Sequence, residues 1–225
     1  MKVLVVLTNI ETYGNTDDTT GLWLSEATEF VTVMEQAGIS VDYVSPKGGY
    51  VPLDPRSLKY VNEEIRQVYQ ADDFRNRALS NSMKPEDVIP EDYDAVYYTG
   101  GHGVMWDFPG NAELNEISNL IFQQGGFVTS VCHGIAGLFE LQTPSGERLI
   151  TGKAITGFTT TEEYLSGKAL KVPFMNEKIA QKYDANFQKR RAYKPFVVQD
   201  GRLITGQNPF SATLVAKKLL VALKK

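Results

Sequence analysis

The feature that most constrains the fold is the stretch 125–136, where a β-type run passes through a cysteine and a glycine into a helical pattern. Residues 127–131 are rich in β-branched side chains, which favour strands. Cys132, His133 and Gly134 follow at once, and the apolar spacing beyond them is helical. A strand that turns sharply into a helix lifts a side chain above the edge of a parallel sheet. The stretch therefore predicts an α/β fold with the Cys132 thiol at a strand's carboxyl end.

A cysteine at such a turn faces backbone N–H groups of the helix start, which favour a negative charge. We therefore expect the pKa of the Cys132 thiol to be lowered and the thiolate to be a nucleophile. The chain has one cysteine and two histidines, and one of these histidines, His133, is adjacent to it. The alternatives are that Cys132 is an inert buried side chain and that His133 only packs at the helix start.

The composition limits the classes of protein. The 225 residues, 42% of them hydrophobic, suffice for one large core, and we expect a single domain over 1–225. A net charge of −4 without a basic stripe makes nucleic acid and anionic membranes poor partners. One cysteine excludes an internal disulfide, and so few nitrogen and sulfur ligands predict no metal and no cofactor. Without a leader or a run of roughly 18 apolar residues, we expect a cytoplasmic protein.

Strand-like and helix-like segments alternate along the chain, which predicts a doubly wound, mainly parallel sheet with helices on both faces. Strands are expected at 3–8, 39–45, 94–99, 127–131, 149–155, 196–198 and 203–206, and helices at 20–37, 111–124 and from 207 onward. The segment 48–90 interrupts this alternation and is too long for an ordinary connection. We interpret it as an inserted cap over the sheet edge, with a plain surface excursion as the alternative.

Glu26 falls on the apolar face of the helix expected at 20–37, four residues from both Leu22 and Phe30. A carboxylate on that face is costly, and the usual escape is protonation or a strong partner. Glu26 is therefore a candidate protonated acid beside the thiol. The alternative is a glutamate near the helix end that reaches water.

The run Gly100-Gly101-His102-Gly103 follows the strand expected at 94–99. Glycines let the backbone approach a ligand closely and point amides at it. With the amide that follows Cys132, they could form an oxyanion hole. His102 could equally be an ordinary loop histidine.

Two adjacent acids, Glu162 and Glu163, follow a strand-to-loop segment that contains Phe158. They are either acids in the first turn of a helix, or one of them orients His133. The residues alone do not decide between these possibilities.

Three motifs together resemble the ThiJ/PfpI superfamily: Gly21-Leu22-Trp23-Leu24-Ser25-Glu26, Gly100-Gly101-His102-Gly103 and Val131-Cys132-His133-Gly134. Further features resemble its Hsp-type chaperone and glyoxalase III branch, namely Thr156-Gly157-Phe158 followed by Glu163, Thr205-Gly206-Gln207-Asn208-Pro209, and the long insert. The resemblance covers essentially the whole chain, and the motifs occur in the expected order.

The resemblance implies a flavodoxin-like fold and a set of site residues. Cys132 is then the nucleophile on a nucleophile elbow, His133 the general acid/base and Glu163 the acidic third member of a triad, with Glu162 as its rival. Glu26 is the protonated glutamate that hydrogen-bonds the cysteine sulfur. Gly101, His102, Gly103 and Phe158 are expected around the oxyanion and the substrate. Ile135 stands where many relatives have proline, which would only stiffen the helix start.

The activity implied is that of a glutathione-independent glyoxalase (glyoxalase III), which converts methylglyoxal, a small 2-oxoaldehyde, and water to D-lactate. The branch also implies a homodimer and a stress-chaperone or protein deglycase role with unfolded or glycated protein partners. The alternatives are a holdase chaperone or redox-sensing stress protein, and a cysteine amidase or peptidase. A glutamine amidotransferase is disfavoured, because no histidine follows His133.

Overall fold

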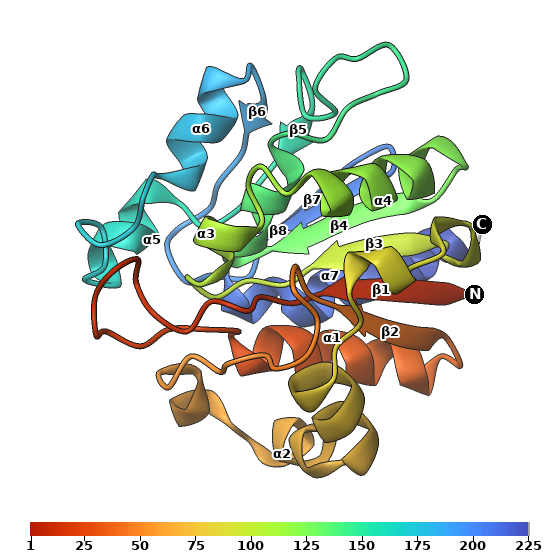
Figure 1. Cartoon of the computed structure of the whole chain (residues 1–225). Coiled ribbons are helices and arrows are strands. Elements are labelled where there is room, and N and C mark those ends of the chain that lie inside the picture. Colours follow the sequence, from red (N-terminus) through yellow and green to blue (C-terminus); the bar gives the residue numbers. More distant parts are fainter. Residues whose placement is uncertain (225) are drawn as a thin grey trace.

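The computed structural model describes residues 1–224, and its centre is a six-stranded sheet in the order β2-β1-β3-β4-β8-β7 (Figure 1). The strands are β1 (Lys2–Val6), β2 (Ser40–Val44), β3 (Ala95–Tyr98), β4 (Phe127–Val131), β7 (Val197–Asp200) and β8 (Leu203–Gly206). Only β7 is antiparallel to its neighbour in this sheet. The short strands β5 (Ala154–Ile155) and β6 (Asn186–Phe187) form a separate parallel pair. The architecture is the doubly wound, mainly parallel α/β sheet that the alternating pattern predicted, and it agrees with the flavodoxin-like fold that the family resemblance implied.

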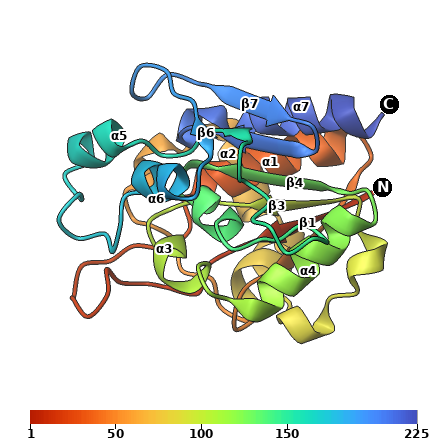
Figure 2. The same ribbon diagram turned by 90° about the horizontal axis from the view of Figure 1, so that it is seen from above.

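Helices cover both faces of the sheet. The α-helices are α1 (Leu24–Gln36), α2 (Glu63–Gln70), α3 (Val104–Asp107), α4 (Ala112–Gln123), α5 (Thr160–Leu165), α6 (Asn176–Lys182) and α7 (Ala212–Leu223). A π-helix spans Phe74–Ser80, and 3₁₀ helices span Ser57–Tyr60, Pro85–Asp87, Pro90–Asp92, Cys132–Leu138 and Pro209–Ser211. In Figure 2 the sheet lies between α1 and α7 on one side and α3 and α4 on the other. Within residues 1–224, no helix is long and apolar enough to cross a bilayer.

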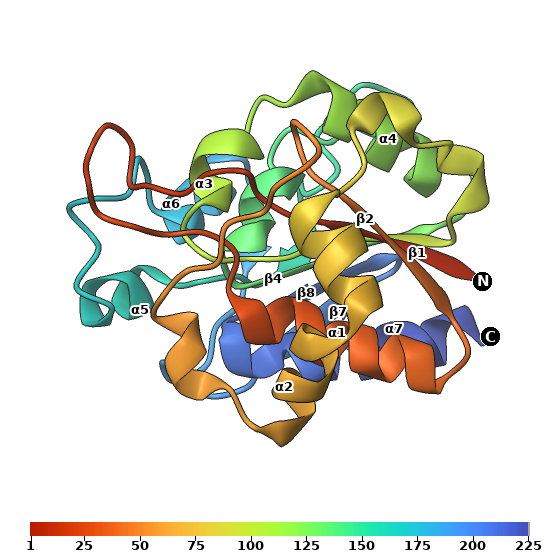
Figure 3. The ribbon, with the colours of Figure 1, turned by 60° about the horizontal axis from the view of Figure 1, so that its bottom comes forward.

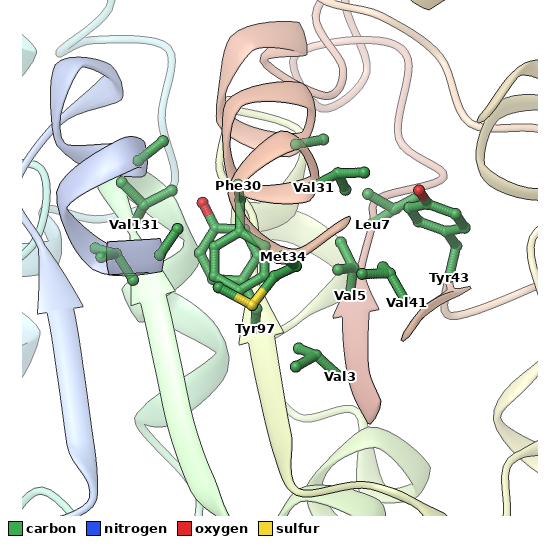
Figure 4. Packing of buried hydrophobic residues seen from close by; sticks show 14 of the residues in the cluster. Val3, Val5, Leu7, Phe30, Val31, Met34, Val41, Tyr43, Tyr97 and Val131 are labelled. Carbon is green, nitrogen blue, oxygen red and sulfur yellow. The ribbon is translucent and has the colours of Figure 1, made fainter. Parts of the chain in front are cut away.

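The runs 3–6 of β1 and Ala95–Tyr98 of β3 are buried on both faces of the sheet, which explains why they are continuously apolar. Along β1, Val3 and Val5 point into the core beneath α1 and α7, whereas Leu4 and Val6 point into the core beneath α4. Figure 4 shows the first of these cores, where Phe30 of α1 stacks on Tyr97 of β3 at a centroid distance of 3.7 Å. These two cores fix the carboxyl ends of the strands, where the site lies.

Two expected elements differ from the observed ones. Helix α1 begins at Leu24 and not at residue 20, because Leu22 pairs with Leu53 and exchanges backbone hydrogen bonds with Pro52 and Asp54. Tertiary pairing therefore overrides the local helical pattern at 20–23. The strand expected at 149–155 is reduced to β5, since only its last two residues find a partner strand.

Most of the segment 48–90 lies beside the sheet rather than over its carboxyl edge. Helix α2 packs on α1, and the π-helix packs on β2 (Figure 3). Only the short 3₁₀ turn around residues 56–60 extends to the functional site described below. The cap role of the insert stays a prediction.

Candidate active site

Cys132 stands on a sharp turn at the end of β4. Its φ of 57° lies in the left-handed region, which costs a non-glycine residue roughly 1–2 kcal/mol. The chain then enters the 3₁₀ helix Cys132–Leu138. Gly134 allows this path, since a Cβ there would lie 2.3 Å from the Tyr98 carbonyl oxygen. The strand-to-helix turn expected at 125–136 is therefore present, with a 3₁₀ helix in place of an α-helix.

The cysteine borders a cavity of about 550 Å³ at the carboxyl ends of the strands. Its wall combines two histidines, two cations and a group of aromatic rings. The lining residues are Trp23, Arg56, Lys59, Tyr60, His102, Cys132, His133, Phe158, Leu165, Ser166, Tyr193, Pro209 and Phe210. Cys132 is only 2% exposed, so a small molecule in the cavity can reach the sulfur far more readily than a folded polypeptide can.

Cys132, His133 and Glu163 form a connected series. The Cys132 Sγ lies 3.3 Å from Nδ1 of His133, and Nε2 of His133 lies 2.8 Å from Oε2 of Glu163. Burial alone would raise the pKa of Glu163, but the His133 charge and hydrogen bonds from both histidines hold that pKa well below its ordinary value. The ionised carboxylate accepts the Nε2 proton of His133, which leaves Nδ1 to accept a proton from the thiol.

His102 hydrogen-bonds the second oxygen of the Glu163 carboxylate. Its Nε2 lies 2.8 Å from Oε1 of Glu163, and its Nδ1 lies 2.8 Å from a guanidinium nitrogen of Arg56. Arginine can only donate, so Nδ1 must accept and the ring is neutral with its proton on Nε2. Burial, together with the nearby His133, lowers the pKa of His102 to about 4, in agreement with this neutral form. Arg56 is held in turn by the buried carboxylate of Asp54 at 2.6 Å.

Glu26 lies behind the sulfur, fully buried in the first turn of α1. Its Oε2 accepts the Gly100 N–H at 2.6 Å, while Oε1 has no hydrogen-bond partner within residues 1–224. Burial raises the pKa of Glu26 well above its ordinary value, which favours the protonated carboxyl. The proton expected on this residue from the sequence is thus favoured by its surroundings.

The pKa of the Cys132 thiol does not follow the expectation. Complete burial raises this pKa well above its ordinary value. The 3₁₀ turn does not offset the desolvation of a thiolate. The resting form is therefore the thiol.

The structure separates the two adjacent acids. Glu162 closes a capping box with Thr159 at the start of α5, and its other oxygen accepts from the side-chain amides of Gln207 and Asn208. Glu163 faces His133 instead. Successive helical residues point about 100° apart, and here one of the pair ties the chain's C-terminal region to α5 while the other enters the site.

Only some of the other site residues predicted from the sequence line the cavity. Phe158 lines the cavity and packs on the His133 ring at a centroid distance of 4.2 Å. Gly101 and Gly103 do not line it. A Cβ on Gly101 would lie 2.1 Å from the Gly21 carbonyl oxygen, and one on Gly103 would lie 2.7 Å from that of Ile10. Gly101 and Gly103 therefore allow the backbone to pack closely at these two points. The oxyanion role of residues 100–103 stays a prediction.

Several lining residues were not foreseen. Arg56 lies in the insert, and Tyr193 and Phe210 lie near the C-terminus, with no local pattern that marks them as site residues. Trp106 and Phe108 lie outside the cavity lining and pack against Tyr13 and Tyr98. Only contacts between distant segments identify these walls.

Three side chains of the site are spaced closely enough to be compared with a set of metal ligands. His102, His133 and Glu163 each offer a ligand atom within 4.8 Å of one another. However, Nδ1 of His102 accepts from Arg56, and its Nε2 carries the proton donated to Glu163. No lone pair of His102 is therefore free for a metal, and the arrangement does not fit one.

The chain is similar to known proteins over nearly its whole length. Residues 19–222 match the family model described as the DJ-1/PfpI family. "Glyoxalase 3" of Candida albicans and "Glutathione-independent glyoxalase HSP31" of Saccharomyces cerevisiae are each 33% identical to the chain, over 99% of it and 98% of their own length. The crystal structure of the Candida albicans glyoxalase III matches with a TM-score of 0.86 at 32% identity, over 99% of this chain and 97% of that one. Rapid Encystment Protein 24 KDa of Francisella tularensis matches with a TM-score of 0.95 at 35% identity, over 99% and 98%. The chain therefore belongs to the DJ-1/PfpI family.

Proposed function

We propose that this protein is a glutathione-independent glyoxalase that converts methylglyoxal and water to D-lactate, with Cys132 as its nucleophile. The observation that carries the proposal is the series from the Cys132 sulfur through His133 to Glu163, with contacts of 3.3 and 2.8 Å, on the wall of a cavity. The names of the relatives that match nearly the full chain support the same activity.

The first step is addition of sulfur to the aldehyde carbon. His133 takes the thiol proton at Nδ1 as the carbon–sulfur bond forms, and the ionised Glu163 stabilises the resulting imidazolium. Protonated Glu26 stabilises the sulfur by facing it with a proton rather than a charge. Backbone N–H groups near Gly101 and His133 are the candidates to stabilise the oxygen of the hemithioacetal, and of these two residues His133 lines the cavity.

The second step moves hydrogen within the adduct. His133 passes a proton to the hemithioacetal oxygen, and the neutral ring then removes the proton from the former aldehyde carbon to give an enediol. Protonation of the neighbouring carbon yields the lactyl thioester. One carbon is oxidised and its neighbour is reduced, so no external oxidant or cofactor is required. Water then cleaves the thioester, releasing lactate and restoring the thiol.

The test is to mix the purified protein with methylglyoxal alone and to measure D-lactate with a stereospecific dehydrogenase. We expect lactate from the wild type and none above background from Cys132→Ala. Tyr50→Ala, at an exposed side chain outside the cavity, is the matched control and should keep full activity. Undiminished lactate from Cys132→Ala would rule out the proposed nucleophile.

A holdase role is the second candidate, and exposed apolar side chains at the cavity mouth favour it. Tyr60 is 52% exposed, Leu165 64% and Phe210 45%, and such a patch can bind non-native chains. If the holdase role is independent of the chemistry, Cys132→Ala suppresses aggregation of a heated client protein as well as wild type does. A peptidase is disfavoured, because Cys132 is almost wholly covered.

We also propose that the protein works as a cytoplasmic homodimer, as the family resemblance implies. Light scattering of the purified protein should give twice the 25.0 kDa mass of the chain. A monomer over the whole micromolar range would contradict the dimer without affecting the proposed chemistry.

A further inference from the structure

Four basic side chains lie within one short turn of the chain, and all of them are exposed: Lys189, Arg190, Arg191 and Lys194. We call residues 189–194 the basic turn. Of its four cations, only Lys189 forms an ion pair within residues 1–224, with Glu177 at 2.6 Å. The Arg190 guanidinium lies over the Phe196 ring at 5.3 Å. The turn therefore presents positive charge that the rest of the protein leaves largely uncompensated, although the net charge of −4 gives no sign of it.

The backbone of the basic turn is held in one shape by buried side chains. The Arg190 N–H donates to the side-chain oxygen of Gln207 at 2.7 Å. The Lys194 carbonyl oxygen accepts from the side-chain amide of Asn208 at 2.9 Å. Between them, Tyr193 has a φ of 57°, which a non-glycine residue keeps only where its surroundings impose it. The turn is thus preorganised, and little entropy is lost in ordering it when a partner binds.

The charge distribution indicates what kind of anion fits the basic turn. Removing its four positive charges from the total of −4 leaves −8 on the rest of the chain. Nucleic acid or an anionic membrane would meet this negative charge wherever it extends past the turn. Surface charges interact over about 8 Å at physiological ionic strength, so a short anionic segment that contacts only the turn escapes most of this repulsion. The distribution therefore favours a short acidic segment of a protein.

Exposed apolar side chains adjoin the basic turn. The ring of Tyr193, within the turn, lies 6.4 Å from that of Phe210, and Phe210 is 45% exposed. Leu165, which borders the same cavity mouth, is 64% exposed. Apolar side chains of a partner can pack here while its carboxylates meet the cations, and such charge complementarity sets specificity and the rate of association.

We propose that the basic turn docks a short acidic segment of a partner protein, in which glutamate or aspartate residues are interspersed with apolar ones. Carboxylates of the segment pair with Arg191 and Lys194, and its apolar side chains contact Phe210. Docking uses no reacting group of the site, so it does not depend on the proposed glyoxalase reaction.

The experiment measures fluorescence anisotropy of a labelled peptide of glutamate, leucine and serine, titrated with the full chain. We expect binding at low salt that weakens as salt is added. The double variant Arg191→Gln/Lys194→Gln should bind about tenfold more weakly, because it removes two ion pairs. Arg66→Gln/Arg75→Gln removes the same charge at exposed positions of the 48–90 segment and should bind within about twofold of wild type. Cys132→Ala should bind as wild type does.

A matched peptide with glutamine in place of glutamate tests the wild type itself, so the result does not depend on how the variants fold. This peptide should bind at least about tenfold more weakly than the acidic one. Equal binding of the two peptides would assign the contact to the apolar side chains alone and overturn the proposal. No binding of the acidic peptide at low salt, or equal losses in the two double variants, would also overturn it. Tighter binding of single-stranded DNA or of phosphatidylserine vesicles than of the acidic peptide would contradict a protein partner.

Discussion

Glu163→Gln is the sharpest test of the site, because the hydrogen bonds around this residue dictate how an amide must sit. Arg56 can only donate to Nδ1 of His102, so Nε2 of His102 carries a proton and needs an acceptor. The carbonyl oxygen of the introduced amide must then face His102, which turns the NH₂ group of the amide toward Nε2 of His133. That nitrogen becomes the acceptor, and the His133 proton moves to Nδ1, facing the Cys132 sulfur.

In that tautomer His133 cannot take the thiol proton. In other nucleophile–histidine–acid triads, a substitution that leaves the histidine in the wrong tautomer lowers kcat by about 10⁴-fold. This loss corresponds to about 5 kcal/mol of transition-state free energy. Since the substitution keeps the side-chain shape and replaces a buried charge with a neutral amide, the protein should still fold. We therefore expect a loss of about 10⁴-fold in kcat with KM nearly unchanged.

Two measurements check this reasoning. Steady-state lactate formation gives kcat, and ¹⁵N NMR of the ring nitrogens reports the tautomers directly, because the chain has only two histidines. The control is Ser166→Ala, which removes a 3.1 Å hydrogen bond to Glu163 Oε1 but keeps the charge, and it should lose at most about tenfold. Activity of Glu163→Gln within tenfold of wild type, or a His133 proton still on Nε2, would refute the argument.

Three further predictions concern stability. Arg56→Met should lower the free energy of unfolding, measured in urea, by about 3 kcal/mol, because it leaves the buried Asp54 carboxylate without its cation. Arg56→Lys should recover most of the lost stability. Equal losses in both variants would contradict an ionic role for Arg56. Burial raises the pKa of Asp107 to about 7, so the folded state holds a proton that the unfolded state loses above about pH 4. The free energy of unfolding should therefore fall by roughly 2 kcal/mol between pH 5 and 7. Asp107→Asn should remove this pH dependence, and an unchanged pH dependence in the variant would show that Asp107 does not cause it. Gly134→Ala should cost about 2 kcal/mol or more by overpacking against the Tyr98 carbonyl, and a melting temperature equal to that of the wild type would show that the turn has room to relax.

Much of the fold could be predicted because it depends on local patterns. A continuous apolar run marked β1, and a run rich in β-branched side chains marked β4. Helical spacing marked α4 at 112–123, against an expected 111–124. The predictions failed where a distant partner decided the outcome. Leu22 has a helical sequence context but pairs with Leu53 in the structure. Residues 149–153 do not form a strand, because they have no partner strand.

The sequence by itself determined the position of the cysteine at a strand end, the histidine beside it, and the burial of Glu26 on an apolar helix face. These follow from the order of neighbouring residues and from helical periodicity, which act within one or two turns of chain. It could not choose between Glu162 and Glu163, because adjacent acids have the same local preferences and differ only in the direction that packing gives them.

The tertiary structure alone decided the tautomer of His102, the protonation of the thiol and the lining of the cavity beside Cys132. Arg56 is 46 residues from His102 in sequence, and the aromatic rings of the cavity wall come from segments as far apart as Trp23 and Phe210. The pKa of Cys132 depends on how completely the folded chain excludes water from the sulfur, which no local pattern encodes. Desolvation and contacts between distant side chains exist only after the chain has folded, and they set the chemistry of this site.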